Sequence, residues 1–165
     1  GGSYVGCFTA QALARQGALS PEQLFHLSVH RAASPEEIGR MLNTSVRTVS
    51  IVEKGPKIGF GFEPGTGWPV LGDLARLKVK KYPNTTITEI GPGGVLCEST
   101  DDEGEPVSRI LPCDAVVVAS GVHPDDSLKR ALAKRGINAV CVGNALKLGK
   151  AMEAIRAGAE LAATL

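Results

Sequence analysis

Residues 1–17 read GGSYVGCFTAQALARQG, a glycine-rich turn that runs directly into a helical pattern. Apolar residues recur at helical spacing from Tyr4 to Gln16, and Gly17 ends the run as a C-terminal cap. A glycine turn of this kind normally reverses a buried parallel strand into a helix. The sequence opens on the turn itself, so we expect the first strand to be missing and the chain to be truncated at its N-terminus.

The small residues of this turn resemble the Gly-x-Gly-x-x-Gly pattern of dinucleotide-binding βαβ units. Gly1 and Gly6 take the first and third positions, and Ser3 takes the second. In this pattern the glycines make the turn, admit the pyrophosphate and let the helix pack on its strand, while the helix N-terminus supplies N–H groups and a positive dipole. The alternative is a purely structural turn. On the first interpretation, the cofactor contacts come from Gly1, Gly2, Ser3, Tyr4, Val5 and Gly6.

An acidic residue stands where a second strand should end. Residues 47–53, RTVSIVE, are rich in β-branched side chains, and Glu53 closes them. An acid at this place hydrogen-bonds the adenosine ribose of NAD and repels the 2′-phosphate of NADP, so we expect NADH and disfavour NADPH. In this pattern the acidic residue usually follows the glycines by ~20 residues. Glu53 has this spacing if a helical insertion at about 18–47 is not counted. Lys54 is assigned to the same site, and the alternative for Glu53 is a solvated strand end.

The remaining pattern predicts an α/β protein. Within the insertion, Ser20-Pro21 and Ser34-Pro35 each open a short helix. We expect a three-layer Rossmann-like dinucleotide-binding fold, with a parallel sheet and an antiparallel β-hairpin as an accessory. The later elements are predicted as a helix at 70–77, a hairpin at 85–90 and 95–99, a strand near Arg109, parallel strands at 114–119 and 138–142, and helices at 127–135 and 145–165.

Composition excludes several classes of function. The 165 residues carry 18 Lys and Arg against 17 Asp and Glu, which leaves no electrostatic footprint for nucleic acid or an anionic membrane. The four cysteines form no Cys-x-x-Cys pair, and His26 and His30 have no third ligand nearby in sequence, so we expect no metal site and buried free thiols. No apolar run approaches the ~20 residues of a membrane span. A cytoplasmic location is expected.

The order of the segments resembles one group of flavoenzymes. The chain is similar to the C-terminal FAD/NAD(P)-binding region of NADH:flavin oxidoreductases related to old yellow enzyme, the group of 2,4-dienoyl-CoA reductase and 2-enoate reductase. The resemblance covers nearly the whole chain. It rests on the glycine turn, the insertion, RTVSIVEKGPKIG, GTGWPVLGDLARLKVK, DAVVVASGVHPDD and NAVCVGNALKLGKAMEAIRAGAELA.

The resemblance implies a division of the chain between two cofactors. Residues 1–121 would form the NAD(P)H-binding subdomain and residues 122–165 the returning segment of the FAD-binding subdomain. Ser120 and Gly121 would make the turn where the chain leaves the first subdomain. Gly143 and Asn144 resemble a Gly-Asp segment whose acid contacts the FAD ribityl chain, with Asn144 in place of the acid, so FAD is a possible second cofactor. The family's FMN and iron–sulfur cluster belong to parts that this chain lacks.

The resemblance also implies a reaction. The chain would hold NADH for hydride transfer to a flavin, on the same polypeptide or a separate chain, and the full-length enzyme would reduce an enoate or enoyl-CoA. None of its side chains is assigned a catalytic role, and we do not expect the fragment to be active alone. The alternatives are a non-catalytic nucleotide-sensing or interaction module, a decayed fragment, or a methyltransferase-like α/β domain.

Overall fold

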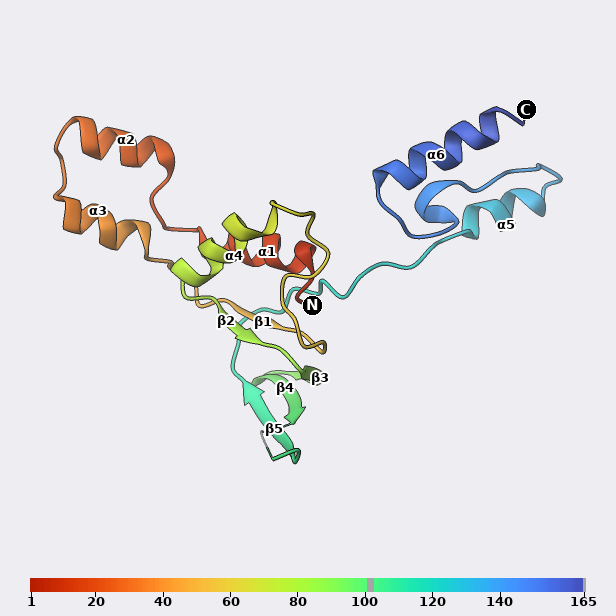
Figure 1. Cartoon of the computed structure of the whole chain (residues 1–165). Coiled ribbons are helices and arrows are strands. Elements are labelled where there is room, and N and C mark those ends of the chain that lie inside the picture. Colours follow the sequence, from red (N-terminus) through yellow and green to blue (C-terminus); the bar gives the residue numbers. More distant parts are fainter. Residues whose placement is uncertain (101–102, 165) are drawn as a thin grey trace. The chain divides into compact units, whose positions relative to one another are not determined.

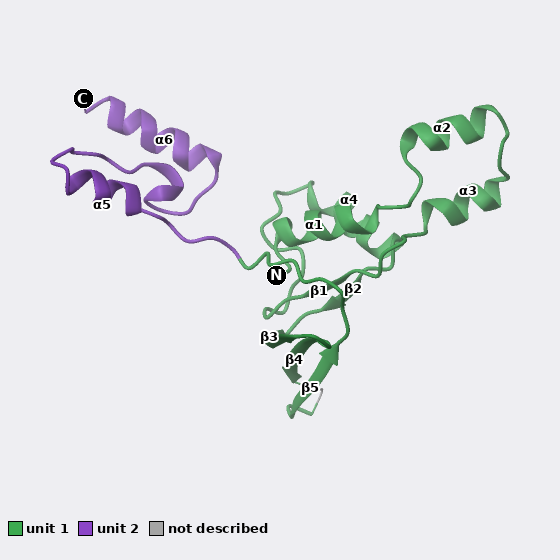
Figure 2. Ribbon diagram, turned by 180° about the vertical axis from the view of Figure 1, so that it is seen from behind, with its two compact units in different colours: residues 1–120 green, residues 121–165 purple. Residues whose placement is uncertain are grey.

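The computed structural model describes residues 1–100 and 103–164. Figure 1 shows its helices and strands in chain order. The chain divides into two compact units, Gly1–Ser120 and Gly121–Leu165, which Figure 2 colours separately and which are described one at a time below.

The core of the first unit lies between two helices and a short strand. Helix α1 (Tyr4–Ala14) packs against α4 (Gly67–Arg76) and against β1 (Ser50–Val52). Both helices were predicted, and so was a strand within residues 47–53. Small residues on α1 let the helices approach closely, and larger aliphatic side chains of α4 fill the space between them. The buried cluster consists of Cys7, Ala10, Ala14, Ile51, Val70, Leu74, Leu77 and Val79.

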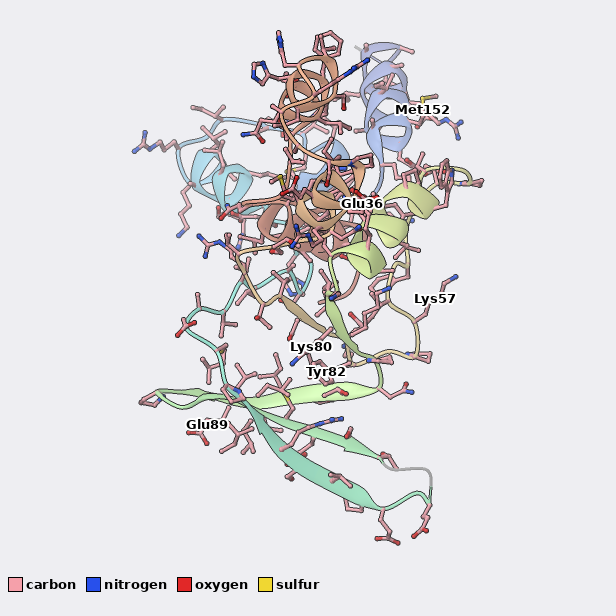
Figure 3. The ribbon with its side chains drawn as sticks, turned by 90° about the vertical axis from the view of Figure 1, so that its left-hand side faces the viewer. Glu36, Lys57, Lys80, Tyr82, Glu89 and Met152 are labelled. Atoms are coloured by element: carbon pink, nitrogen blue, oxygen red, sulfur yellow. The ribbon has the colours of Figure 1, made fainter. Side chains whose placement is uncertain are left out.

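β1 belongs to a parallel pair whose second member was not predicted from the sequence. It pairs with β2 (Lys80–Tyr82), with Ile51 opposite Lys81. The polar sequence Lys-Lys-Tyr carries no apolar alternation, so no periodicity signal marked it as a strand. Lys80 and Tyr82 are labelled on this strand in Figure 3, where they lie between the helices and the second sheet.

The predicted hairpin is confirmed and extended by a third strand. β3 (Thr85–Gly91), β4 (Gly94–Thr100) and β5 (Pro106–Leu111) form an antiparallel sheet in the order β3-β4-β5. β5 contains the strand predicted near Arg109. At the start of β4, Gly94 has φ +125, and a Cβ there would lie 2.2 Å from the carbonyl oxygen of Leu111. Only glycine therefore fits at this corner.

Both helices of the insertion form where the Ser-Pro signals predicted them. α2 (Pro21–Val29) and α3 (Pro35–Leu42) each begin with a capping box. The Ser20 hydroxyl accepts from the N–H of Gln23, and the Gln23 side chain accepts from the N–H of Ser20. Ser34 and Glu37 repeat the arrangement. These bonds satisfy N–H groups that a helix start leaves without a partner, so local sequence is enough to begin each helix.

The predicted parallel strand at 114–119 is wrong. Among the described residues this segment joins no β-ladder, and Val118 is 73% exposed. Its β-branched composition favours an extended backbone, but a strand exists only when a neighbour accepts and donates its backbone hydrogen bonds. A cavity of about 600 Å³, lined by residues 46–52 and 111–117 among others, lies beside the segment.

The second unit consists of α5 (Ser127–Ala133), a 3₁₀ turn η1 (Gly143–Ala145) and α6 (Ala151–Ala162). The helix predicted at 127–135 is confirmed, and the final helix is shorter than the predicted 145–165. The strand predicted at 138–142 is wrong, because no strand pairs with it within the described residues of this unit. Val140 is accordingly exposed.

Cysteine burial follows the prediction only in part. Cys7 is buried in the core cluster and Cys97 is buried on β4, whereas Cys113 is exposed and Cys141 is half-buried. Burial raises the pKa of the Cys7 and Cys97 thiols, which keeps them protonated and inert.

A carboxylate on α4 joins this helix to α1. Oδ2 of Asp73 accepts from Nε2 of Gln11 at 2.8 Å and from Nε of Arg15 at 2.9 Å, and Oδ1 accepts from Nη2 of Arg76 at 2.9 Å. Partial burial opposes ionisation of Asp73, but the hydrogen bonds from Arg76, Arg15 and Gln11 hold its pKa below the ordinary value. The ionised group therefore fastens the two helices that cover the core.

We expect Asp73→Asn to lower the free energy of unfolding by about 1–3 kcal/mol, because the amide satisfies fewer donors and carries no charge. Equilibrium urea unfolding at neutral pH measures this loss. The pKa of Asp73 is lower in the folded state than in the unfolded state. The difference in free energy of unfolding between wild type and Asp73→Asn should therefore shrink as the pH falls through the folded-state pKa. Asp126→Asn is the matched control, because Asp126 forms an exposed pair with Arg130 in the second unit. An equal loss in both variants would contradict the assigned role.

Candidate functional site

The glycine turn leaves no room for side chains at its first and third glycines. A Cβ on Gly1 would lie 2.2 Å from the carbonyl oxygen of Ala119, and one on Gly6 would lie 1.9 Å from the carbonyl oxygen of Gly1. Both contacts are with backbone atoms, which cannot rotate away as a side chain could. The turn, the first turn of α1 and the end of segment 114–119 therefore approach one another as closely as backbone allows.

Glu53, directly after β1, holds the turn in place. Its Oε2 accepts from the N–H of Gly2 at 2.7 Å, and its Oε1 accepts from the N–H of Gly55 at 2.8 Å. Glu53 is only 7% exposed. Burial opposes its ionisation, but these two backbone hydrogen bonds hold the pKa of its carboxyl below the ordinary value. An ionised carboxylate thus stands beside the glycines, with lone pairs left to accept from a ligand hydroxyl.

The start of α1 offers donors for an anion. Ser3 is the N-cap residue, in extended conformation and without a side-chain cap bond. The N–H of Tyr4 donates to the carbonyl of Phe60 at 2.9 Å, and that of Cys7 donates to Ser3 at 2.9 Å. Within the part of the chain that the structure describes, the N–H groups of Val5 and Gly6 have no backbone acceptor. These two donors and the positive end of the helix dipole suit a phosphate oxygen.

A loop that no sequence pattern predicted closes over the turn. The N–H of Gly59 donates to the carbonyl of Gly2 at 2.7 Å, and Ser3 forms a parallel β-bridge with Phe60. Gly59 is buried with φ +87, a conformation that glycine adopts without strain. The Cys7 thiol adds a bond to the carbonyl of Gly2 at 3.6 Å. The glycines of GFGFEPGTG were the available signal, but their pattern indicated only an irregular loop.

The structure brings most of the predicted site residues together. Gly1 to Gly6, Glu53 and Lys54 lie around the turn, and Cα of Ser120 is 3.4 Å from the Cβ position of Gly1. Gly121, Gly143 and Asn144 belong to the second unit. There Gly143 has φ +59, and Oδ1 of Asn144 accepts from the N–H of Gly149 at 3.1 Å. Asn144 therefore closes a local loop with its side-chain oxygen.

The first unit has the parts that a dinucleotide requires: a backbone cradle that a Cβ would fill, N–H donors at a helix start and an ionised carboxylate nearby. A family model described as pyridine nucleotide-disulphide oxidoreductase matches residues 1–144. The chain belongs to this family. Pyridine nucleotide-disulphide oxidoreductases bind FAD and NAD(P).

Two curated proteins are similar to this pyridine nucleotide-disulphide oxidoreductase chain. A metal reductase of Desulforamulus reducens is 34% identical over 155 residues, which is 94% of this chain and 22% of that protein. An NADH oxidase of Thermoanaerobacter brockii is 26% identical over 163 residues, which is 98% of this chain and 20% of that protein. The chain thus spans about a fifth of the length of these relatives.

Solved structures support the same assignment. A 2-naphthoyl-CoA reductase in complex with 2-naphthoyl-CoA matches the whole chain with a TM-score of 0.68 and 25% identity, over 20% of its own length. Histamine dehydrogenase from Rhizobium sp. 4-9 matches 79% of the chain with a TM-score of 0.59 and 22% identity, over 19% of its own length, and supports the fold alone. The chain is an α/β domain of the pyridine nucleotide-disulphide oxidoreductase family.

The described residues contain neither a candidate membrane span nor a candidate metal centre with three or more protein ligands. No helix among them has the length and apolar character to cross a membrane. Across residues 1–100 and 103–164, no group of three or more His, Cys, Asp or Glu side chains could hold a metal ion.

Proposed function

We propose that this chain is the nicotinamide-nucleotide-binding portion of a larger flavin oxidoreductase and that it holds NADH in position for hydride transfer to a flavin. The observation that carries the proposal is the bond of 2.7 Å from the N–H of Gly2 to the buried carboxylate of Glu53. This bond joins the phosphate-binding turn to the ribose-binding strand end. The flavin supplies the redox chemistry when bound, and the chain supplies binding and orientation.

The diphosphate is assigned to the glycine turn. The N–H groups of Val5 and Gly6 would donate to its oxygens at the positive end of α1. Ser3, in the middle position of the glycine pattern, has a small side chain that leaves the phosphate approach open. Tyr4 would contribute through its side chain, because its N–H is taken by Phe60.

The adenosine ribose is assigned to Glu53, with Lys54 alongside. Each carboxylate oxygen of Glu53 accepts one backbone N–H and has lone pairs left for the ribose hydroxyls. Because its pKa is held low, the carboxylate stays charged at neutral pH and repels a 2′-phosphate. We therefore propose that NADH is preferred over NADPH.

The electron acceptor is assigned to the rest of the protein. The similar proteins share this segment but are named for different reactions. One is a metal reductase, one is an NADH oxidase and one is a 2-naphthoyl-CoA reductase. The likeness to 2-naphthoyl-CoA reductase favours an aromatic or enoyl thioester as substrate, as in the 2,4-dienoyl-CoA reductase group. FAD is assigned to the second unit at Gly143 and Asn144, and the flavin partner to the same or a separate polypeptide. We further propose that the protein acts in the cytoplasm.

Titration with NADH and NADPH tests the nucleotide site. Trp68 is the single tryptophan of the chain and is 75% exposed, so energy transfer from Trp68 to the reduced nicotinamide reports binding. We expect saturable binding of NADH, and binding of NADPH weaker by about tenfold or more because of the repulsion at Glu53. Equal affinities would contradict the role of Glu53. No binding of either nucleotide to a chain shown to be folded by near-UV circular dichroism would favour an interaction module.

A further inference from the structure

Two histidines lie side by side on helix α2. His26 lies in the last turn of this helix, and His30, one turn further on, is its C-cap residue. Their ring centroids are 4.5 Å apart, with an angle of 47° between the ring planes. Residues four apart on a helix lie on the same face, so the helix itself holds the two imidazoles together. Histidines with this spacing are the pair through which a helix binds Zn²⁺ in the His-x-x-x-His pattern.

The ring nitrogens of this pair are available to an ion. Both side chains are exposed to solvent. Within the described residues, neither imidazole takes part in a hydrogen bond or an ion pair. A neutral imidazole binds a metal ion through the lone pair of one ring nitrogen. The pair therefore offers two nitrogen ligands without the loss of an existing bond.

The place of the pair on the helix favours a cation. His26 and His30 lie at the carboxyl end of α2, which carries the negative end of the helix dipole. Glu22, an exposed carboxylate, lies one turn before His26 on the same face. Arg31 follows His30 and opposes a cation, but its side chain is exposed and can extend into solvent.

Helix α2 has little else to stabilise it. It is nine residues long, and none of its residues is buried. A helix shorter than ~12–15 residues is marginal in water by itself. In its last turn, the N–H of His30 donates to the carbonyl of His26 at 3.0 Å. An ion bound to both imidazoles would hold this turn closed.

We infer that His26 and His30 bind one divalent transition-metal ion of the class that takes imidazole ligands, such as Ni²⁺, Cu²⁺ or Zn²⁺, and that the ion stabilises α2. Mg²⁺ and Ca²⁺ prefer oxygen ligands and should not bind. The sequence predicted no metal site because it shows no third protein ligand nearby, but water can take the remaining coordination positions. The site needs neither nucleotide nor flavin, so it is independent of the proposed function.

Calorimetric titration of the full chain with NiCl₂ tests the site, with MgCl₂ as the comparison ion. We expect saturable binding of one Ni²⁺ per chain and no binding of Mg²⁺ at the same concentrations. Loss of an outer partner of a metal site already weakens binding 10–100-fold, so His26→Ala and His30→Ala should each weaken Ni²⁺ binding by about tenfold or more. His123→Ala is the matched control, because His123 is exposed and belongs to the second unit.

Relocated pairs test the helical spacing. Glu22→His combined with His30→Ala places histidines at positions 22 and 26, again four apart, and should restore Ni²⁺ binding. Ser28→His combined with His30→Ala places them two apart, on different faces of the helix, and should not. Restoration by both combinations would overturn the inference. So would wild-type affinity in His26→Ala, which would assign the ion to other donors such as the exposed thiol of Cys113.

Hydrogen exchange measured by mass spectrometry tests the effect on the helix. An ion that binds only the formed turn stabilises it in proportion to the logarithm of the ion concentration, so exchange in residues 27–31 should slow by up to about 100-fold at a free Ni²⁺ concentration of 100 times Kd. The His26→Ala variant should show no such slowing. Unchanged exchange in the wild-type chain at saturating Ni²⁺ would overturn the stabilisation of α2.

Discussion

Gly6→Ala is expected to lower the free energy of unfolding by about 1–3 kcal/mol, through overpacking, and to weaken NADH binding by about tenfold or more. The added methyl would lie 1.9 Å from the carbonyl oxygen of Gly1 and 3.7 Å from Cβ of Ala119. The first contact is with backbone, so relief requires the turn to move away from the helix. That movement displaces the N–H groups assigned to the diphosphate. Chemical denaturation and the Trp68 titration measure the two effects.

Gly72→Ala is the matched control for this change. Gly72 also lies in a helix, α4, but a Cβ there meets no atom within 4 Å. Alanine at an open helical position is expected to stabilise by about 0.5–1 kcal/mol. The same substitution should therefore lower the free energy of unfolding at Gly6 and raise it at Gly72. A neutral Gly6→Ala would show that the turn does not depend on the absence of a side chain.

Glu53→Ala is expected to lower the free energy of unfolding by about 2–4 kcal/mol and to abolish detectable NADH binding. The substitution leaves the N–H groups of Gly2 and Gly55 without their acceptor, and an unsatisfied buried donor costs about 1–3 kcal/mol. It also removes the acceptor assigned to the ribose hydroxyls. Urea unfolding and the Trp68 titration measure the two losses.

Glu53→Gln separates the charge from the hydrogen bonds. The amide oxygen can still accept one of the two backbone bonds, so we expect a smaller loss of stability than in Glu53→Ala and a reduced preference for NADH over NADPH. The pKa of Glu53 is lower in the folded state than in the unfolded state, so its ionisation contributes stability that is fully present above the unfolded-state pKa. This contribution to stability is lost as the pH falls through the pKa that Glu53 has in the folded state. The difference between wild type and Glu53→Gln should therefore shrink on acidification.

Glu89→Gln provides the control for loss of a negative charge. Glu89 lies on β3, is exposed and is labelled in Figure 3. We expect this variant to match wild type in stability and in nucleotide preference. If Glu53→Gln behaved in the same way, the charge of Glu53 would have no role in stability or in the choice between NADH and NADPH.

Elements with local signals were predicted from the sequence. The Ser-Pro pairs at 20–21 and 34–35 begin α2 and α3 through capping boxes that join residues only three positions apart. The hairpin of β3 and β4 follows from two β-rich runs around GPGG. In each case the hydrogen-bonding partner lies a few residues away in the chain, so the pattern contains the whole interaction.

Elements that depend on distant partners were not predicted correctly. β2 is polar and exists because it pairs with β1, 30 residues earlier by the register of Ser50 with Lys80. Segment 114–119 has a stronger strand pattern and forms no ladder within the described residues. Propensity favours an extended backbone, but pairing requires a neighbour at the right distance and register.

The sequence by itself determined the residues of the glycine turn, the helix that follows it and an acidic residue at the end of a β-rich run. Only the tertiary structure decided that Glu53 binds Gly2, 51 residues away, that Gly59 and Phe60 close over the turn, and that Asp73 fastens α4 to α1. The physical reason is the range of the interactions. Caps and turns are satisfied within a few residues, whereas buried donors and carboxylates are satisfied by whichever groups the folded chain brings within about 3 Å.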